Sequence, residues 1–285
     1  MSRRIDGQMV GYVFAVAILL VVSASSPLAA DVPGDPAVLT DLNTTIEVYS
    51  NSDAGIASWI IGGVNQINRE WFWFRVGDAS PTNPEQSIDT LLRTLNNASD
   101  DGENLGYDTL SQKFVSEGQF SVLVKYTLAG GDVGTGDSDL GLAVKIVNLS
   151  QQTLDFHFFQ LIDFDLAGTP GGDTVQVINA NLVEQGQSNH QASTVAVPPS
   201  TVIQLAYSPA IYNLLTDSQG DDLTNTPVGG SVGPGNVEYG FQWDITLAPG
   251  ANFMFSENQL LVPEPASLSL LLIGAAFMAR RRRNA

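Results

Sequence analysis

Three aspartates lie close together in a glycine-rich stretch of the chain and could bind a cation. Asp132, Asp137 and Asp139 fall within residues 130–141, among glycines that leave the backbone flexible. Carboxylate oxygens on such a loop are the ligands that Ca²⁺ prefers. The spacing matches neither an EF-hand nor a nonapeptide calcium repeat, and aspartate and glycine also form ordinary turns. Two interpretations therefore remain for these three residues, a calcium site and an ordinary loop.

A second group of acids lies on one predicted strand. Residues 154–166 alternate in polarity, which places Asp155, His157, Asp163 and Asp165 on one side. Two carboxylates can hydrolyse a glycoside when they flank the scissile bond from opposite sides. Aspartates on one face of one strand supply only one side of such a cleft. We therefore expect this face to be the solvated outer face of an antiparallel sheet.

Other residue types needed for catalysis are scarce. The chain has two histidines, His157 and His190, and no cysteine. Two histidines exclude a three-histidine zinc site, and the lack of cysteine excludes thiolate ligands and cysteine nucleophiles. We also expect no nucleophile elbow that would position a serine. The body is therefore predicted not to be an enzyme.

Aromatic side chains are the remaining candidates for ligand binding, because exposed rings can stack on sugars. The four tryptophans are Trp59, Trp71, Trp73 and Trp243. Most aromatic residues at strand spacing belong to a core. If several were exposed along a groove, the body would instead be a carbohydrate-binding module, assisted by calcium and associated with exopolysaccharide.

The elements that position these residues are predicted strands. Polarity alternates with a period of two over residues 120–128, 140–146, 154–166 and 239–247, and Gln160 interrupts one otherwise apolar face. The first two stretches predict a hairpin with a long tip. About ten strands, with turn residues every eight to twelve positions, predict an all-β fold, an antiparallel β-sandwich.

Residues 31–261 form a single acidic body, because no proline- and serine-rich linker divides them. Six of the 12 basic residues and two of the 30 acidic residues lie outside this range, so the body has six basic and 28 acidic residues and a formal net charge of −22. Nucleic acid is excluded as a partner, since phosphate binding needs clustered lysine and arginine. Without disulfides, a body of about 230 residues can still bury a sufficient core.

The N-terminal residues 1–30 have the pattern of a secretory signal peptide. Arg3 and Arg4 precede an apolar run at residues 9–22, and small residues follow up to Ala30. This order predicts an apolar helix that is cleaved after Ala30 during export.

The C-terminal residues 262–285 form three blocks. The first block is Val262, Pro263, Glu264 and Pro265, where the prolines disfavour helix before them. Residues 266–279 are uncharged and favour an apolar helix, but fourteen residues rise only about 21 Å against a hydrocarbon core of about 30 Å. The last block is Arg280, Arg281, Arg282 and Arg283, which would stay on the cytoplasmic side and fix the orientation.

This order of motif, apolar segment and basic cluster resembles the PEP-CTERM sorting signal of Gram-negative bacteria. In that family the signal is recognised and cut by exosortase, a membrane-embedded cysteine transpeptidase, in bacteria that make exopolysaccharide. The resemblance implies exosortase as a partner, transient anchoring in the inner membrane, and delivery to the cell surface or extracellular matrix. An ordinary C-terminal anchor, or a buried core helix with a basic end, are the alternatives for this segment.

Overall fold

The computed structural model describes residues 30–31, 35–103 and 106–263. Residues 1–29 of the predicted signal peptide lie outside these ranges, as do Glu264, Pro265, the apolar segment and the four arginines. Among the described residues, no helix has the length and apolar character that crossing a membrane requires. The helices expected at the two ends of the chain stay predictions.

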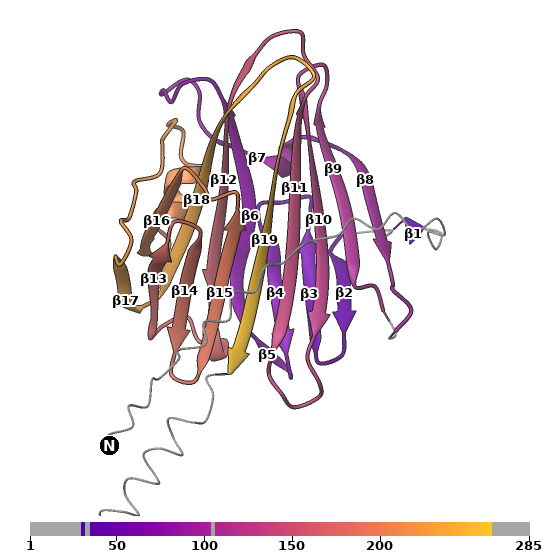
Figure 1. Cartoon of the computed structure of the whole chain (residues 1–285), viewed down its shortest axis with the longest axis vertical. Coiled ribbons are helices and arrows are strands. Elements are labelled where there is room, and N and C mark those ends of the chain that lie inside the picture. The colour runs from indigo at the N-terminus through magenta and orange to yellow at the C-terminus, as the bar shows by residue number, and fades with distance from the viewer. Residues whose placement is uncertain (1–29, 32–34, 104–105, 264–285) are drawn as a thin grey trace, which may run out of the picture.

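Ten strands form the first sheet, and all their pairings are antiparallel (Figure 1). In order across the sheet they are β1 (Ala30–Asp31), β8 (Leu92–Ser99), β9 (Thr109–Ser116), β10 (Phe120–Gly130), β11 (Ser138–Asn148), β19 (Asn252–Pro263), β15 (His190–Val197), β14 (Leu182–Gln187), β13 (Asp173–Asn179) and β17 (Ser231–Gly235). The expected hairpin is confirmed, because β10 and β11 pair along their whole length, from Phe120 opposite Asn148 to Gly130 opposite Ser138.

Nine strands form the second sheet. Seven follow one another in the order β16 (Val202–Tyr207), β18 (Val237–Leu247), β12 (Leu154–Phe164), β6 (Ile67–Val76), β4 (Gly55–Ile61), β3 (Thr44–Tyr49) and β2 (Ala37–Asp41), while β5 (Val64–Asn65) pairs with β4 and β7 (Gln86–Ser87) with β6. The contact between β4 and β6, at Gly55 and Ile56 opposite Glu70, is the one parallel pairing among the described strands.

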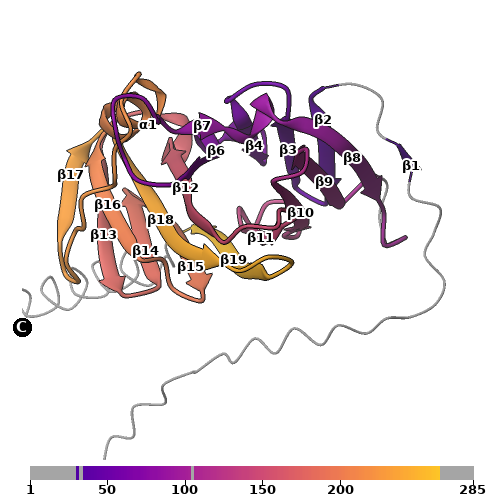
Figure 2. The same cartoon turned by 90° about the horizontal axis from the view of Figure 1, so that it is seen from above.

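The two sheets pack face to face (Figure 2). The side chains between them form an aromatic core. Phe255 of β19 stacks on Trp243 of β18 with ring centroids 3.9 Å apart, and Phe158 of β12 lies 5.9 Å from Phe255. These contacts between sheets confirm the predicted all-β sandwich. The described residues form nineteen strands rather than about ten, because segments without a predicted strand contain short strands such as β5, β7 and β17 and longer ones such as β9 and β14.

Short helical segments and a long loop cover the outer face of the second sheet. The segments are η1 (Ile88–Thr90) and α1 (Ala210–Thr216), and the loop at residues 217–230 follows α1. The third helical segment, η2 (Leu166–Gly168), lies at one end of the sandwich beside β5, β14 and β15. Figure 2 shows α1 and β7 on the side of this sheet that faces away from the first sheet.

The expectation of a solvated face is wrong for Asp163 and correct for Asp155. Asp163 is only 3% exposed, and Phe159 and Leu161 on the same side of β12 are buried. The cover explains this burial, since the backbone N–H of Tyr212 in α1 donates to Glu238 of β18. The polar side chains under the cover, such as Asp163, are therefore enclosed and must find partners within the protein, whereas Asp155 at the start of β12 keeps a side chain that is 54% exposed.

Candidate functional site

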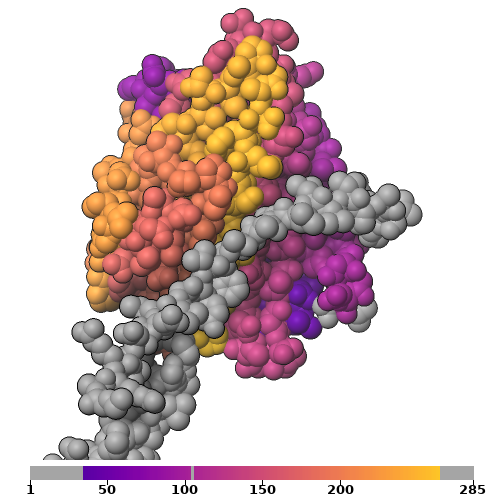
Figure 3. Space-filling model, viewed as in Figure 1, coloured from indigo at the N-terminus to yellow at the C-terminus, as the bar shows by residue number. Residues whose placement is uncertain are grey.

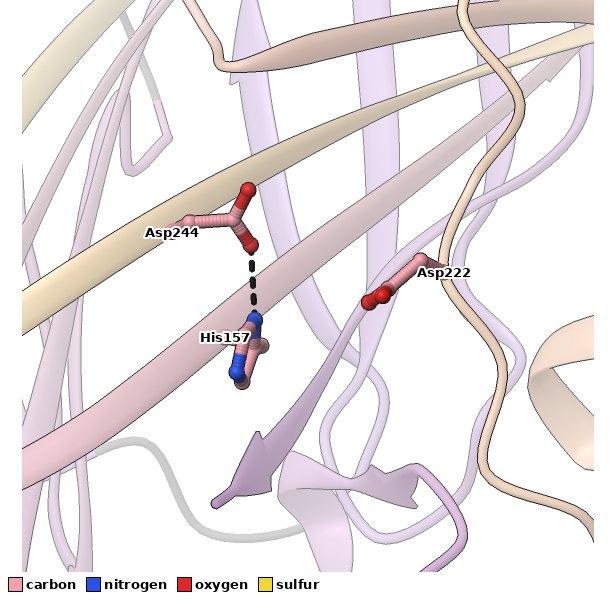
Figure 4. A group of neighbouring side chains, drawn as sticks. All are labelled: His157, Asp222 and Asp244. Carbon is pink, nitrogen blue, oxygen red and sulfur yellow. Dashed lines mark hydrogen bonds and ion pairs between the residues drawn. The ribbon is translucent and has the colours of Figure 1, made fainter. Parts of the chain in front are cut away.

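Three neighbouring strands place three polar side chains side by side on the covered face. Asp244 of β18 lies opposite His157 of β12, and His157 lies opposite Arg75 of β6. Residues at paired positions share a face of the sheet, so strand register alone brings this group together. Asp222, from the loop after α1, joins it from above the sheet (Figure 4).

Arg75 is the centre of an ion-pair cluster. Its fully buried guanidinium group pairs with Glu85 and donates to Oδ1 of Asp222 at 2.5 Å. It also donates to the carbonyl oxygens of Asp221 at 2.7 Å and Gly77 at 3.2 Å. A buried charge is tolerated only with such a set of acceptors. The cluster thereby fastens the loop after α1, and the segment before β7, onto β6.

Gln242 of β18 links this cluster to the histidine. Its Nε2 atom donates to Oδ1 of Asp244 at 2.7 Å and to Oδ1 of Asp222 at 3.0 Å. Its Oε1 atom accepts the backbone N–H of Leu223 at 2.7 Å. Both the donor and the acceptor of the amide are used, so Gln242 holds two carboxylates in fixed positions.

His157 and Asp244 form the titratable part of the site. Nδ1 of His157 lies 2.6 Å from Oδ1 of Asp244, and this hydrogen bond raises the pKa of His157 and lowers the pKa of Asp244. Nε2 of His157 lies 3.6 Å from a carboxylate oxygen of Asp155 and has no hydrogen-bond partner. The pair can hold a proton, but no hydroxyl group of the described residues is bonded to the imidazole.

A serine with the sequence spacing of a nucleophile elbow lies elsewhere. Residues 229–233 read Gly-Gly-Ser-Val-Gly, which has the Gly-x-Ser-x-Gly spacing that we did not expect in this chain. Ser231 begins the edge strand β17 and pairs with Gln176 of β13. A nucleophile elbow is a sharp turn from a strand into a helix, and this serine is not on one.

Two groups in the described part of the chain have ligand atoms close enough together to hold a metal ion. One is His157, Asp222 and Asp244; the other is Asp100, Asp101 and Asp108. In the first group, donors from Arg75 and Gln242 already occupy the carboxylate oxygens that face one another. Its hydrogen bonds make it a self-contained network.

The predicted calcium ligands do not form such a group within the described residues. Asp139 accepts a hydrogen bond from Nδ2 of Asn258 at 2.6 Å, and burial raises the pKa of Asp139. Asp132 and Asp137 lie in the β10–β11 turn, where their backbone carbonyl oxygens accept Nδ2 of Asn43 at 3.4 and 3.2 Å. Calcium binding at these three residues stays a prediction.

A polar groove lies beside the Arg75 cluster and shares Glu85 with it. It is an open groove of about 450 Å³, bounded by the β3–β4 connection, β7 and the end of α1. Side chains that line it include Asn51, Ser52, Asp53, Gln86, Ser87 and Thr216. The hydroxyl group of Tyr212 donates to Oδ2 of Asp53 at 2.9 Å and fixes that carboxylate. The groove thus offers amide, hydroxyl and carboxylate groups to a ligand.

The tryptophans do not form an exposed platform. Trp59, Trp71, Trp73 and Trp243 are each at most 2% exposed. Trp73 borders the groove from within the protein, where its ring lies edge-on to Tyr212. The four tryptophans are therefore buried, as expected for most aromatic residues at strand spacing.

A group of buried polar residues between the sheets was not identified as a cluster from the sequence. Nε2 of Gln160 donates to Glu70 at 2.8 Å and to Glu257 at 2.7 Å, and Nε2 of Gln259 donates to Glu70 at 2.8 Å. The interruption of an apolar face by Gln160 was the one signal of this cluster. Its partners come from β6 and β19, which lie far away in the sequence.

The residues of the predicted sorting signal that the structure describes are at the end of the last strand. Val262 lies opposite Gln191, and Pro263 lies opposite His190 of β15. Ala30, the predicted cleavage position of the signal peptide, lies in β1 opposite Ala98 of β8.

Comparison with known families decides what this segment is. The family model of the PEP-CTERM protein-sorting motif matches residues 261–283. The chain carries a PEP-CTERM sorting motif. This finding confirms the resemblance, and a PEP-CTERM motif implies export, sorting to the cell surface and processing by exosortase.

The body resembles solved structures with very different sequences. A bacterial glucoamylase complexed with acarbose matches with a TM-score of 0.52 and 13% identity, over 86% of this chain and 36% of the glucoamylase, so the chain spans about a third of that protein. The Slr1438 protein of Synechocystis sp. PCC 6803 matches with a TM-score of 0.55 and 8% identity, over 84% of this chain and 100% of that one.

A putative aldose 1-epimerase of Escherichia coli K12 is also similar, with a TM-score of 0.50 and 10% identity, over 80% of this chain and 99% of the epimerase. Such identities show that the fold of the body is shared, and the fold alone does not determine activity. No curated protein sequence matches the chain.

Proposed function

We propose that this chain is an exported protein that exosortase processes at its C-terminus, leaving the acidic sandwich at the cell surface or in the extracellular matrix. Pro263, Glu264 and Pro265 serve recognition, and residues 266–279 hold the chain in the inner membrane until it is processed. Arg280 to Arg283 keep the C-terminus on the cytoplasmic side. The match of the sorting motif to residues 261–283 is the observation that carries this proposal.

The body is proposed to be non-catalytic. Its best candidate for acid–base chemistry, His157, is bonded to Asp244 and to no nucleophile among the described residues. The carboxylates around it are engaged by Arg75 and Gln242, which suits a group that fastens the cover of the sheet. A strongly negative surface also suits a secreted protein, since net charge keeps proteins soluble.

Replacing Pro263, Glu264 and Pro265 by alanine tests the sorting proposal. Cell fractions are compared by immunoblot and intact mass, and we expect unprocessed chains that retain the arginine cluster to accumulate in the membrane fraction. Replacing the surface residues Glu117 and Gln119 by alanine is the matched control and should leave processing unchanged. Normal processing of the triple variant would refute recognition through this motif.

Glycan binding in the groove is a second candidate function. The volume of about 450 Å³ falls within the range of small-molecule sites, roughly 300–1,000 Å³. Its amide, hydroxyl and carboxylate groups can pair with the many hydroxyl groups of a sugar. Assistance by calcium at Asp132, Asp137 and Asp139, and exopolysaccharide as the natural partner, belong to this candidate.

A glycan array, with and without a chelator, tests this second function. We expect binding that falls at least tenfold in Asn51→Ala and Gln86→Ala, because each removes a polar group from the groove. Gln151→Ala, on the exposed β11–β12 turn, should bind as the parent chain does. The absence of any glycan signal from the folded protein would remove the candidate, and chelator-insensitive binding would remove the role of calcium.

A further inference from the structure

The last strand carries the chain to one particular end of the sandwich. β19 lies between β11 and β15, and its residues cross the face seen in Figure 3 between those two strands. It ends at Pro263, at the lower end of the molecule in Figure 1. Only Glu264 and Pro265 separate Pro263 from the uncharged residues 266–279.

Three turns meet at this end around Asn43. The backbone N–H of Asn43 donates to the carbonyl oxygen of Gly131 at 3.4 Å, and its own carbonyl oxygen accepts the N–H of Gly62 at 3.0 Å. Gly136, in the same turn as Gly131, approaches Pro263 so closely that a Cβ atom there would lie 2.9 Å from the proline ring. We call the surface formed by residues 42–43, 62–64, 131–137 and 263 the Asn43 end.

The Asn43 end presents three exposed apolar side chains, two from turns and one from the first residue of β5. Val133 is 89% exposed, Leu42 is 50% exposed and Val64 is 42% exposed. The three turns contain no lysine or arginine, and their polar groups are mainly backbone amides, one asparagine and the acidic residues Asp132 and Asp137. Exposed apolar residues on three adjacent segments at one end of the sandwich suit an interface between water and lipid.

We propose that the Asn43 end lies against the bilayer surface while residues 266–279 hold the chain in the inner membrane, with Val133, Leu42 and Val64 in the headgroup layer. This inference rests on the proposed function. Two extended residues span at most about 7 Å. The headgroup layer on each side of a bilayer is roughly 5–8 Å thick. A spacer of two residues therefore keeps Pro263, and Gly136 beside it, within about one headgroup layer of the hydrocarbon.

Fluorescent labelling of the full chain tests the orientation. The chain has no cysteine, so Val133→Cys and Leu149→Cys each create a single labelling position. Leu149 is 45% exposed on the β11–β12 turn, at the opposite end of the sandwich. Both variants are reconstituted in vesicles of phosphatidylcholine and phosphatidylethanolamine that contain a nitroxide-labelled lipid. We expect the label at position 133 to be quenched severalfold more strongly than the label at position 149.

A spacer variant separates contact from anchoring. Inserting about ten glycine and serine residues after Pro263 adds a root-mean-square reach of roughly 18 Å. Quenching at position 133 should then fall to the level at position 149, while the chain still floats with the vesicles. Equal quenching at both positions in a chain that floats would overturn the orientation and leave the proposed function intact. A chain that does not float with vesicles would overturn both.

Discussion

Glu70 and Glu257 are buried between the two sheets, without a basic partner among the residues bonded to them. Burial is the main cause that raises the pKa of Glu70 to about 7, and burial together with the charge of Glu70 raises the pKa of Glu257 to about 8. Tyr126 lies close to Glu70, and its hydroxyl group has no hydrogen-bond partner. The amides of Gln160 and Gln259 stabilise the carboxylates only in part.

These two acids predict a protein that loses stability as the pH rises. An unfolded glutamate has a pKa near 4.3, so between about pH 5 and 8 the folded state retains protons that the unfolded state has lost. Their contribution is complete below about pH 4 and disappears above about pH 8. We expect Glu257→Gln to flatten the fall in unfolding free energy between pH 5 and 9, by an amount on the order of a few kcal/mol.

Urea unfolding at several pH values measures this effect. Glu117→Gln, on the exposed β9–β10 turn, is the matched control and should keep the pH profile of the parent chain. A parent chain that is equally stable at pH 5 and pH 9 would contradict the buried-acid account.

Arg75 predicts that the stability of the protein depends on a buried cation. Its charge has carboxylate and carbonyl partners, so its removal leaves them without a cation. Arg75→Met leaves Glu85 buried without its cation, which we expect to cost about 3–5 kcal/mol of unfolding free energy. The same urea titration measures it, with the exposed Lys125→Met as control. A loss below about 1 kcal/mol would mean that the cover of the second sheet does not depend on this cluster.

The alternation of polarity predicts which residues share a face of a strand, but it does not predict whether that face is buried. Alternation over residues 154–166 placed Asp163 and His157 on one side, and the structure has them on the same face of β12. Whether such a face meets water depends on α1 and the loop at residues 217–230, which fold back over the sheet. Contacts between segments so far apart in the chain leave no local pattern.

At the scale of elements, the strongly alternating stretches were predictable and the short ones were not. Residues 120–128, 140–146 and 239–247 lie within β10, β11 and β18 and form most of each strand, because a period of two sustained over so many residues is typical of a strand. Strands of two residues, such as β5 and β7, carry too little pattern to be recognised. The order of strands across each sheet also depends on pairings such as β11 with β19, which no local signal specifies.

The end of β19 depends on one glycine of the β10–β11 turn. Gly136 has a φ angle of 80°, which non-glycine residues rarely adopt, and it touches Pro263. We expect Gly136→Ala to destabilise the fold by roughly 1–2 kcal/mol and to increase hydrogen exchange at the last residues of β19.

Hydrogen exchange followed by mass spectrometry checks this prediction. Gly134→Ala is the matched control, because its φ angle of 89° imposes similar backbone strain while a Cβ atom there meets nothing within 4 Å. Equal effects of both variants at the end of β19 would show that the contact with Pro263 does not hold the strand.

On the scale of the whole molecule, the sandwich joins its sorting segment without an intervening linker. The family match begins at residue 261, inside β19, which runs to Pro263. The fold of the body and the delivery signal are therefore continuous, and whatever cuts the signal must work close to a folded sheet. The signal was recognisable from the sequence because its order and composition are local, whereas the role of the body depends on long-range contacts.

The intact mass of the protein recovered from the cell surface tests the account most directly. Removal of residues 1–30 and of the segment that ends in Arg280 to Arg283 is the predicted result, and the mass identifies both cleavage positions. Surface protein that still carries the arginine cluster, or native protein found only in the cytosol, would contradict the account.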